Sequence, residues 1–209
     1  MSDKRVAVSI SGTRPLIMHS PDGVDPINPI SIEKKKISGK RTKTEADYLE
    51  LYRLDYLQAI YHCDKVREAE GLSDDKVGPY ISARMIEACM REAAKKQRKG
   101  KVVVSGVMVG PDDYLPLQYN GPESIEELFT DPSRRFISIS PVTIKGSRIM
   151  ACRPKFREWG LDFEVIYDDE QLNRLDIRTI LDTAGKLIGI GAWRPQHGQF
   201  TVTDFQDLD

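Results

Sequence analysis

The sequence predicts an α+β fold in which a core of β-α-β-β-α-β order carries an inserted, helix-containing region and an extra β-hairpin. Two patterns lead to this prediction. Residues 5–11 and 199–205, near the two ends of the chain, alternate apolar with polar side chains, as half-buried strands do. Between them, residues 82–98 and 172–184 place apolar side chains at helical spacing. The order is ferredoxin-like, with a sheet whose helices lie on one face.

Length, charge and cysteine content limit the classes of function. The 209 residues are 40% hydrophobic and 30% charged, which is enough to bury a core and excludes wholesale disorder. Because 31 Lys and Arg oppose 32 Asp and Glu, a uniformly basic nucleic-acid binder is excluded, whereas local basic patches are not. No apolar run approaches the roughly 20 residues that span a bilayer. The three separated cysteines form no CxxC pair, so we expect a cytoplasmic protein with no metal, cofactor or disulfide.

We expect residues 1–209 to form a single domain with an insertion at 14–78. Within the insertion, three prolines and a glycine at 21–29 disfavour regular structure. Residues 34–43 hold six basic side chains around a glycine and predict an exposed loop. Thr44 can cap the helix that follows. The polar segment 62–78 is predicted to be a loop.

The core continues after the insertion with a helix over 82–98, which Gly100 ends. The apolar, β-branched run at 101–109 predicts a central strand, and the proline-containing segment 110–133 predicts a loop. The remaining predicted elements are a hairpin of strands 136–144 and 148–152 with a basic tip at Lys145, a strand at 163–167, a helix that Asp168 or Asp169 caps and Gly185 ends, and a last strand at 199–205.

A loop between the last helix and the last strand combines glycines with aromatic and basic side chains. Gly185 is needed only to end the helix, whereas Gly189, Gly191 and Gly198 exceed that need. Glycine lets a partner backbone or a phosphate come close, and the other side chains of the loop can stack on a nucleotide or pair with it. A rigid connector with its tryptophan in the core is the alternative. The candidate binding residues of the loop are Gly189, Gly191, Trp193, Arg194 and His197.

Three segments of the chain resemble the RAMP superfamily (repeat-associated mysterious proteins), whose RNA-recognition-motif-like subunits form the backbone of CRISPR effector complexes. Residues 10–19, ISGTRPLIMH, are similar to the family's first strand and following turn. Residues 79–91, PYISARMIEACMR, resemble its IPxxSIKGxLR entry into the first helix, with Ala88 where a glycine is common. Residues 189–200, GIGAWRPQHGQF, are similar to its C-terminal glycine-rich loop and last strand. The 14–78 insertion has no counterpart, and similar proteins of phages and prophages suggest a viral origin.

This resemblance implies a protein that binds single-stranded RNA or DNA; of the two we favour RNA, and we expect that the protein does not cut the strand. The resemblance also implies copies that assemble side by side along the strand, or a subunit of a ribonucleoprotein. Clustered cations permit this, because several of them within a few turns of chain can follow a phosphate backbone. Besides those of the loop, the residues expected to contact nucleic acid are Lys34, Lys35, Lys36, Lys40, Arg41, Lys43, Lys145, Arg148 and Arg153.

Two other clusters have structural alternatives. The basic residues at 91–101 either contact nucleic acid or form a solvated helix end that complements the helix dipole. At 153–159 three cations interleave with two aromatic residues, which either stack on bases or fold onto the core.

Two further functions stay open on the sequence. Some RAMP proteins are endonucleases, which suggests His19 as a general acid or base, or Asp25 as a carboxylate that holds Mg²⁺. Aspartates before proline or glycine are also ordinary turn formers, and we favour that interpretation for Asp25. The third function is a structural protein that assembles without nucleic acid. RNA binding requires that the lysine-rich segment and the tryptophan-bearing loop face the same side of the molecule.

Overall fold

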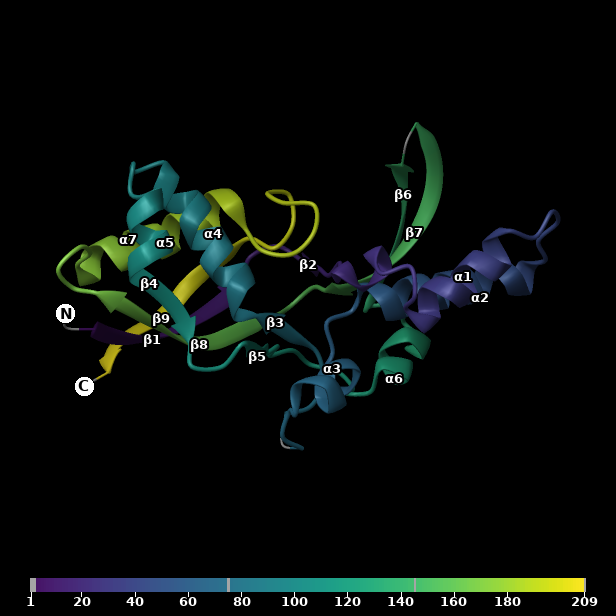
Figure 1. Cartoon of the computed structure of the whole chain (residues 1–209), viewed down its shortest axis with the longest axis horizontal. Helices are drawn as coiled ribbons and strands as arrows, with labels where there is room; N and C mark the ends of the chain where they lie inside the picture. Colours follow the sequence, from purple (N-terminus) through teal and green to yellow (C-terminus); the bar gives the residue numbers. More distant parts are fainter. Residues whose placement is uncertain (1–2, 75, 145, 209) are drawn as a thin grey trace.

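The computed structural model describes residues 3–74, 76–144 and 146–208, and a four-stranded antiparallel sheet forms the core (Figure 1). Its strand order is β4-β8-β1-β9. The strands are β1 (Asp3–Gly12), β4 (Val107–Gly110), β8 (Gly160–Asp168) and β9 (Phe200–Leu208). Helix α4 (Ala83–Lys95) precedes β4, and helix α7 (Arg174–Thr183) precedes β9. The predicted ferredoxin-like α+β fold is confirmed.

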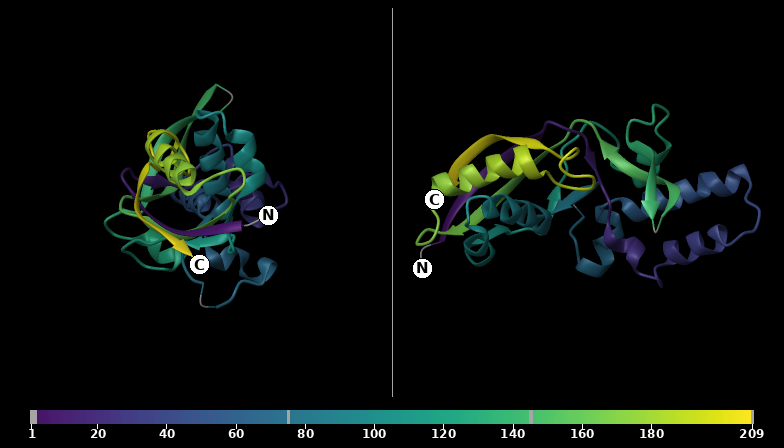
Figure 2. Two further views of the ribbon diagram at one scale, coloured as in Figure 1. Left: turned by 90° about the vertical axis from the view of Figure 1, so that its left-hand side faces the viewer. Right: turned by 90° about the horizontal axis from the view of Figure 1, so that it is seen from above.

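Alternation along the central strands directs one side of the sheet toward the two helices. β1 pairs with β8 and β9 so that Val8 lies opposite both Phe163 and Phe205. These side chains share one core with the buried residues of α4 and α7. Both helices lie on the same face of the sheet (Figure 2). Side chains that point the other way are exposed, such as Asp162, or partly exposed, such as Ser9 and Glu164.

The strand predicted at 101–109 is wrong over most of its length. Gly100–Gly106 form the short helix α5, and only Val107–Gly110 join the sheet, as an edge strand rather than a central one. Val103 is buried in the core, whereas Val104 is 63% exposed. Packing against α4 and the core therefore decides the conformation and outweighs the β propensity of three consecutive valines.

The loop predicted over the lysine-rich segment is also wrong for its first half. Helix α1 (Pro29–Ser38) contains three of its lysines. The Asn28 side chain accepts the Ile30 N–H at 2.9 Å, and a proline occupies the first helical position. Both are features that begin helices, so this local signal prevails over the repulsion between neighbouring lysines.

The rest of the insertion holds one expected helix and one unexpected helix. α2 (Glu45–Ala59) is the predicted helix, and Thr44 and Asp47 form a capping box at its start. α3 (Cys63–Glu70) lies where a loop was predicted, and the His62 side chain caps it. The insertion is thus largely helical, while the assignment of the chain to a single domain interrupted at 14–78 stays a prediction.

A long β-hairpin projects from the middle of the molecule (Figure 1). Its strand β6 (Ile137–Ile144) lies where it was predicted, whereas β7 (Ser147–Phe156) is longer than predicted, and β2 (Leu16–Ile17) pairs with the base of β7. Lys145, at the predicted tip, lies outside the described residues. β7 leads almost directly into β8, so residues 147–168 connect the hairpin to the centre of the sheet.

The last helix begins and ends later than predicted. Asn173 caps α7, because Asp168 is still part of β8. Gly185 does not end the helical segment, since a π-helical turn carries the chain on to Gly189. Shorter elements complete the fold: a 3₁₀ turn at Pro21–Val24, β3 (Tyr80–Ser82), β5 (Tyr114–Pro116) and α6 (Ile125–Thr130). Among the described residues, none of the helices has the length and apolar character needed to cross a membrane.

Candidate nucleic-acid interface

Three segments that are far apart in the sequence meet between the core and the helical insertion. From the glycine-rich loop, the Ala192 N–H donates to the Ile17 carbonyl at 2.7 Å. On the other side of the same segment, the Met18 N–H donates to the Pro154 carbonyl of β7 at 3.0 Å. Residues 15–18 therefore join the loop to the hairpin, and side chains of all three segments reach one surface.

The glycines of the loop are required by its own packing. Gly191 has a φ of +76°, and a Cβ at this position would lie 2.5 Å from the Ile17 carbonyl oxygen. Gly189 also has a φ of +76°, and its Cβ would lie 2.9 Å from the His197 carbonyl oxygen. A side chain is excluded at both positions whether or not a ligand is present. Contact of Gly189 and Gly191 with a polynucleotide stays a prediction, because packing alone accounts for both residues.

Trp193, in the outer part of this loop, stacks against an arginine of the hairpin. The guanidinium carbon of Arg153 lies 5.0 Å from the centroid of the indole ring, and the His197 ring meets the indole edge-on, with 5.7 Å between centroids. Trp193 is half-buried and has a φ of +59°, so it is not the core residue that a rigid connector requires. A cation over an indole face is attracted by roughly 0.5–2 kcal/mol. The pair presents an aromatic surface with positive charge beside it.

β7 supplies a basic stripe beside the loop. Arg153, Lys155 and, just past the end of the strand, Arg157 alternate with buried residues. Phe156 and Trp159 are 0% and 4% exposed and belong to the core. Of the two interpretations of this segment, folding of the aromatic residues onto the core is correct, and only the cations face outward.

Two histidines lie among these cations. Burial first, and then the charges of Arg153 and Lys34, lower the pKa of His19. Burial first, and then the charge of Lys155, lower the pKa of His197. Both imidazoles are therefore neutral at pH 7. Arg153 and Lys34 lie close enough to His19, and Lys155 close enough to His197, to influence the titration of each imidazole.

Of the six basic residues in the lysine-rich segment, Lys34 reaches this surface. It forms an ion pair with Asp55 of α2. The Asp55 carboxylate also accepts the Cys152 N–H of β7 at 3.5 Å, which ties the helical insertion to the hairpin. Arg153 therefore links the two segments, because it lies over Trp193 and acts on His19 together with Lys34 and the Asp55 carboxylate.

Of the other five basic residues, Lys43 lines a groove together with Lys34, and the remaining four do not. Lys36 and Lys40 pair with carboxylates of the insertion at 3.2 and 2.5 Å. Lys43 lines a groove that also contains residues of β7. Lys35 and Arg41 are exposed on the insertion. Contact between these five residues and nucleic acid stays a prediction. Arg148 on the hairpin and Arg194 beside the tryptophan are also exposed, and their contact with nucleic acid stays a prediction too.

We call the shared surface the junction face, because the core, the hairpin and the insertion meet there. Sequence patterns predicted several of its members singly, and Lys155 was one of the three cations of segment 153–159 for which two interpretations stayed open, whereas Arg14 and the neighbouring Asp55 were missed. The alternation of Lys155 with buried residues along β7 was a readable signal for that residue. The junction face is defined as Arg14, His19, Lys34, Arg153, Lys155, Trp193 and His197.

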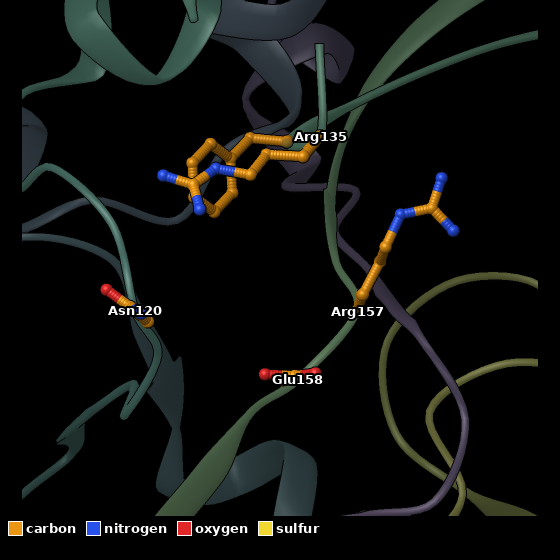
Figure 3. A pocket seen from close by; sticks show the side chains of 5 residues that line it. Asn120, Arg135, Arg157 and Glu158 are labelled. Carbon is orange, nitrogen blue, oxygen red and sulfur yellow. The ribbon is translucent and has the colours of Figure 1, made fainter. Parts of the chain in front are cut away.

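A cavity near the base of the hairpin is too small to be a comparable site (Figure 3). Its volume is about 170 Å³, and its lining residues are Asn120, Arg135, Phe136, Arg157 and Glu158. The Arg135 guanidinium lies over the Phe136 ring, 4.8 Å from its centroid, and covers the aromatic face that a base would need. Sites for small ligands usually measure roughly 300–1,000 Å³.

The sheet face that the helices leave uncovered is acidic. Asp162 and Glu164 of β8, together with Asp112, line a shallow groove of about 390 Å³. RNA-recognition motifs stack bases on the corresponding face with aromatic side chains. Here Glu164 pairs with Arg5 and Asp112 pairs with Lys76 at 2.8 Å, which leaves the Asp162 carboxylate to repel a phosphate backbone. The junction face is therefore the better candidate for nucleic acid.

The basic cluster at the end of α4 lies at the other end of the core. Lys95 pairs with Glu92 and Lys99 pairs with Asp176, both at 2.6 Å. These pairs favour the interpretation of the cluster as a solvated helix end. Of its remaining cations, Lys96 is exposed, and three line a groove of about 540 Å³: Arg91, Arg98 and Lys101.

The aspartates that follow the first strand are engaged in local structure. Asp25 is exposed, and its carboxylate accepts the Ile27 N–H at 3.0 Å, as in an ordinary turn. Asp22 accepts the Ser20 hydroxyl at 2.6 Å and pairs with Lys65 at 2.5 Å. Within residues 3–74, 76–144 and 146–208, no group of three or more His, Cys, Asp or Glu side chains is placed to hold a metal ion.

Fold and site together define a ferredoxin-like α+β protein with a basic and aromatic surface beside its core. No family model and no curated protein matches the chain. Among solved structures, it is similar to a chain of the type III-B CRISPR complex Cmr-beta, seen by cryo-EM bound to cognate target RNA. The TM-score is 0.51 and the identity 10%; the alignment covers 99% of this chain and 61% of that chain. At this identity the likeness shows the fold alone.

Proposed function

We propose that the chain binds single-stranded RNA along the junction face without cutting it, as a RAMP-like subunit of a ribonucleoprotein. The stack of Arg153 on Trp193, with Lys34 and Lys155 close by, carries the proposal. Aromatic rings that stack on bases, beside cations that follow the backbone, are typical of surfaces that bind single strands. Support for RNA rather than DNA comes from the structural neighbour, which is an RNA-bound complex.

The cations at the centre of the junction face are well placed to bind phosphate. Burial lowers the pKa of Arg153 and the pKa of Lys155, which means that both charges are partly withdrawn from water. A phosphate beside them restores a favourable interaction for each charge and releases counterions from the RNA. Affinity should therefore fall steeply as salt is added.

The proposal includes copies that lie side by side along the strand. The core carries an acidic groove on its uncovered sheet face, with Asp162 and Glu164, and a basic groove at the end of α4, with Arg91 and Lys101. The acidic face of one copy complements the basic face of the next. Sedimentation velocity should show a mass that rises with protein concentration or with RNA length. A concentration-independent monomer, with and without RNA, contradicts side-by-side assembly.

Fluorescence anisotropy with a labelled single-stranded RNA tests binding at the junction face. Arg153→Gln should weaken binding about tenfold, which corresponds to about 1.4 kcal/mol. It should also reduce the slope of log affinity against log salt by about 0.7, the value for one phosphate contact on a single strand. The matched control is Arg174→Gln, which removes a guanidinium stacked 4.7 Å from the Phe205 centroid at the other end of the core.

We expect the control to leave both affinity and slope unchanged. Equal losses in the two variants would show that the junction face is not the site. Wild-type protein that binds no RNA and carries none through purification would favour the structural protein that assembles without nucleic acid.

A ribonuclease is the second candidate, and one observation favours it. His19 is neutral at pH 7, because burial and two cations lower its pKa, and those cations are Arg153 and Lys34. A neutral imidazole can accept the proton of a ribose 2′-hydroxyl while neighbouring cations stabilise the negative charge that develops on the phosphate. Incubation with end-labelled RNA, with and without Mg²⁺, tests this function. Cleavage that His19→Ala abolishes would replace the non-catalytic assignment.

A further inference from the structure

A groove of about 410 Å³ lies between the helices of the insertion and β7, next to the junction face. Its volume falls within the roughly 300–1,000 Å³ of small-ligand sites. α2 and β7 pack against each other below it, where the Asp55 carboxylate accepts the Cys152 N–H. The groove therefore lies at a contact between two elements and not on a mobile chain end.

The two walls of the groove are apolar and open to solvent. On α2, Tyr48, Tyr52 and Asp55 recur at steps of four and three residues, so they share the face that is turned toward β7. On β7, the opposite wall consists of Ile149 and Met150. Tyr48 is 51% exposed, and the two β7 side chains are each 46% exposed. A flat apolar ligand between these walls would remove this surface from water.

Cations stand around these walls. Lys34 and Lys43 line the groove from the insertion, and Arg148 lines it from β7. Asp55 balances the charge of Lys34. Among the described residues, neither Lys43 nor Arg148 has a carboxylate within ion-pair distance, so the groove keeps a net positive charge.

The chemistry of the groove selects a ligand that is flat, apolar on both faces and negatively charged at its edge. A nucleotide has this form, since its base can stack on an aromatic ring while its phosphate pairs with cations. An acidic peptide would match the charge and leave the apolar walls unfilled. Lys34 belongs both to the groove and to the junction face, so a strand that crosses Trp193 and Arg153 can continue into the groove.

We propose that the groove between α2 and β7 holds one nucleotide of the bound strand, with its base against Tyr48 and Met150 and its phosphate beside Lys43 and Arg148. This assignment rests on the proposed function and adds a subsite that recognises a base rather than the backbone. The subsite does not select among bases, because stacking tolerates every base and the nearby Asp55 carboxylate is already paired with Lys34.

The test compares two RNA-like probes and two adjacent substitutions in the full-length chain. Oligoadenylate has bases, and an abasic oligomer of the same length has the phosphates without them. Tyr48→Ala removes the aromatic wall. Leu49→Ala is the matched control, because Leu49 is the next residue of α2, is 53% exposed and does not line the groove. Anisotropy titrations give the affinity of each protein for each probe.

Tyr48→Ala should weaken the binding of oligoadenylate about tenfold, the range that one base–aromatic stack contributes. It should leave the binding of the abasic oligomer unchanged, and Leu49→Ala should change neither. In addition, the fluorescence of an oligomer that contains 2-aminopurine should be quenched on binding to wild-type protein and less so on binding to Tyr48→Ala. This second measurement is made at saturation, so it does not depend on a small difference in affinity.

Equal effects of Tyr48→Ala and Leu49→Ala on oligoadenylate overturn the assignment of the groove, as does an equal loss of affinity for the abasic oligomer. If Arg153→Gln weakens binding in the same experiment, the proposed function survives that result. Wild-type protein that binds neither probe overturns both proposals.

Discussion

Two arginine–aromatic stacks lie at opposite ends of the core and differ in what surrounds them. Arg174 lies over Phe205 and also donates to the Asp207 carboxylate at 2.8 Å and to the Phe205 carbonyl at 3.0 Å. Arg153 lies over Trp193, and the part of the chain that the structure describes places no carboxylate within ion-pair distance of it. The charge of Arg174 is neutralised by the Asp207 carboxylate, so we assign the first stack to the framework of the fold. The comparison teaches that the nearby carboxylates, rather than the stacking geometry, distinguish the two stacks: Asp207 pairs with Arg174 directly, whereas Asp55 acts on Arg153 only from beyond ion-pair distance.

Removing the Phe205 ring, which belongs to the framework stack, should have the largest effect of all. It should lower the free energy of unfolding and leave the affinity for RNA unchanged. Phe205 is buried, so Phe205→Ala should lower the free energy of unfolding by about 3–5 kcal/mol, through lost burial and the cavity left behind. Urea denaturation measures this loss. At concentrations where the variant is folded, its affinity for RNA should equal that of the wild type; a large loss of affinity would mean that the two stacks do not differ in function.

Removing the ring at the junction face should act on binding instead. Trp193→Ala should weaken RNA binding by about 1–3 kcal/mol, the contribution of one base–aromatic stack. Because Trp193 is only half-buried, its loss should lower the free energy of unfolding less than Phe205→Ala does. Anisotropy and urea denaturation on the same preparations rank the two variants. The reverse ranking would assign Trp193 to the framework.

The loop that carries Trp193 can be disturbed through its backbone. Gly191→Ala adds a Cβ 2.5 Å from the Ile17 carbonyl oxygen at a φ of +76°, which should cost about 1–3 kcal/mol and weaken RNA binding by displacing the indole. Gly146→Ala is the matched control, because Gly146 has a φ of +83° with nothing within 4 Å of its Cβ position. Thermal unfolding should show the larger loss for Gly191→Ala. Equal losses of stability in the two variants would mean that the loop can move to accept the Cβ, and that the close approach of Gly191 to the Ile17 carbonyl is not needed.

The smallest expected effect is a pH dependence of binding. Burial, Arg153 and Lys34 lower the pKa of His19, so the free protein holds this imidazole neutral at pH 7. A phosphate at the junction face favours the charged imidazole and raises the pKa again, so binding takes up a proton. RNA affinity should rise roughly two- to threefold as pH falls from about 7.5 to about 6. In His19→Gln this rise should become smaller without disappearing, because His197 of the junction face has a pKa lowered in the same way and can still take up a proton; an unchanged rise would locate the titrating group elsewhere.

Acid should also lower the free energy of unfolding, because a buried histidine whose pKa is lowered in the folded state must take up a proton as the pH falls. Burial lowers the pKa of His62, whose Nδ1 accepts the Asp64 N–H at the start of α3. Because the folded-state pKa lies below the ordinary value of 6.5, the free energy of unfolding is at its full value above pH 6.5 and falls below it. Binding measurements below pH 6.5 therefore need a parallel measurement of unfolding, because folding is least affected above that pH.

Much of the core could be predicted from the sequence, because its strands and helices carry local periodic patterns. β1 and β9 alternate, and α4 and α7 repeat at helical spacing. The prediction fails for α5, where three valines favour a strand and packing against α4 imposes a helix. It fails for α1 for a different reason. Asn28 and Pro29 are a helix-start signal that is present in the sequence, and the lysines that follow obscure it.

The candidate site could be predicted only in part. Trp193, Arg153 and Lys34 are recognisable singly, as aromatic and basic residues near glycines or in clusters. Their convergence depends on residues 15–18, whose backbone hydrogen bonds join the loop to β7 and have no local pattern. The groove beside Tyr48 was not predicted, because its walls come from segments about a hundred residues apart.

Trp159 has a mechanical consequence for the whole molecule. Its indole N–H donates to the Arg14 carbonyl at 2.9 Å, and its own carbonyl accepts the Gly12 N–H at 2.8 Å. Trp159 lies between β7 and β8 in the sequence, so these hydrogen bonds hold the base of the hairpin against the end of β1. A pull on the projecting arm by an attached strand is thereby transmitted to the middle of the sheet instead of being absorbed by a flexible hinge. The arm and the core should turn together as one stiff body.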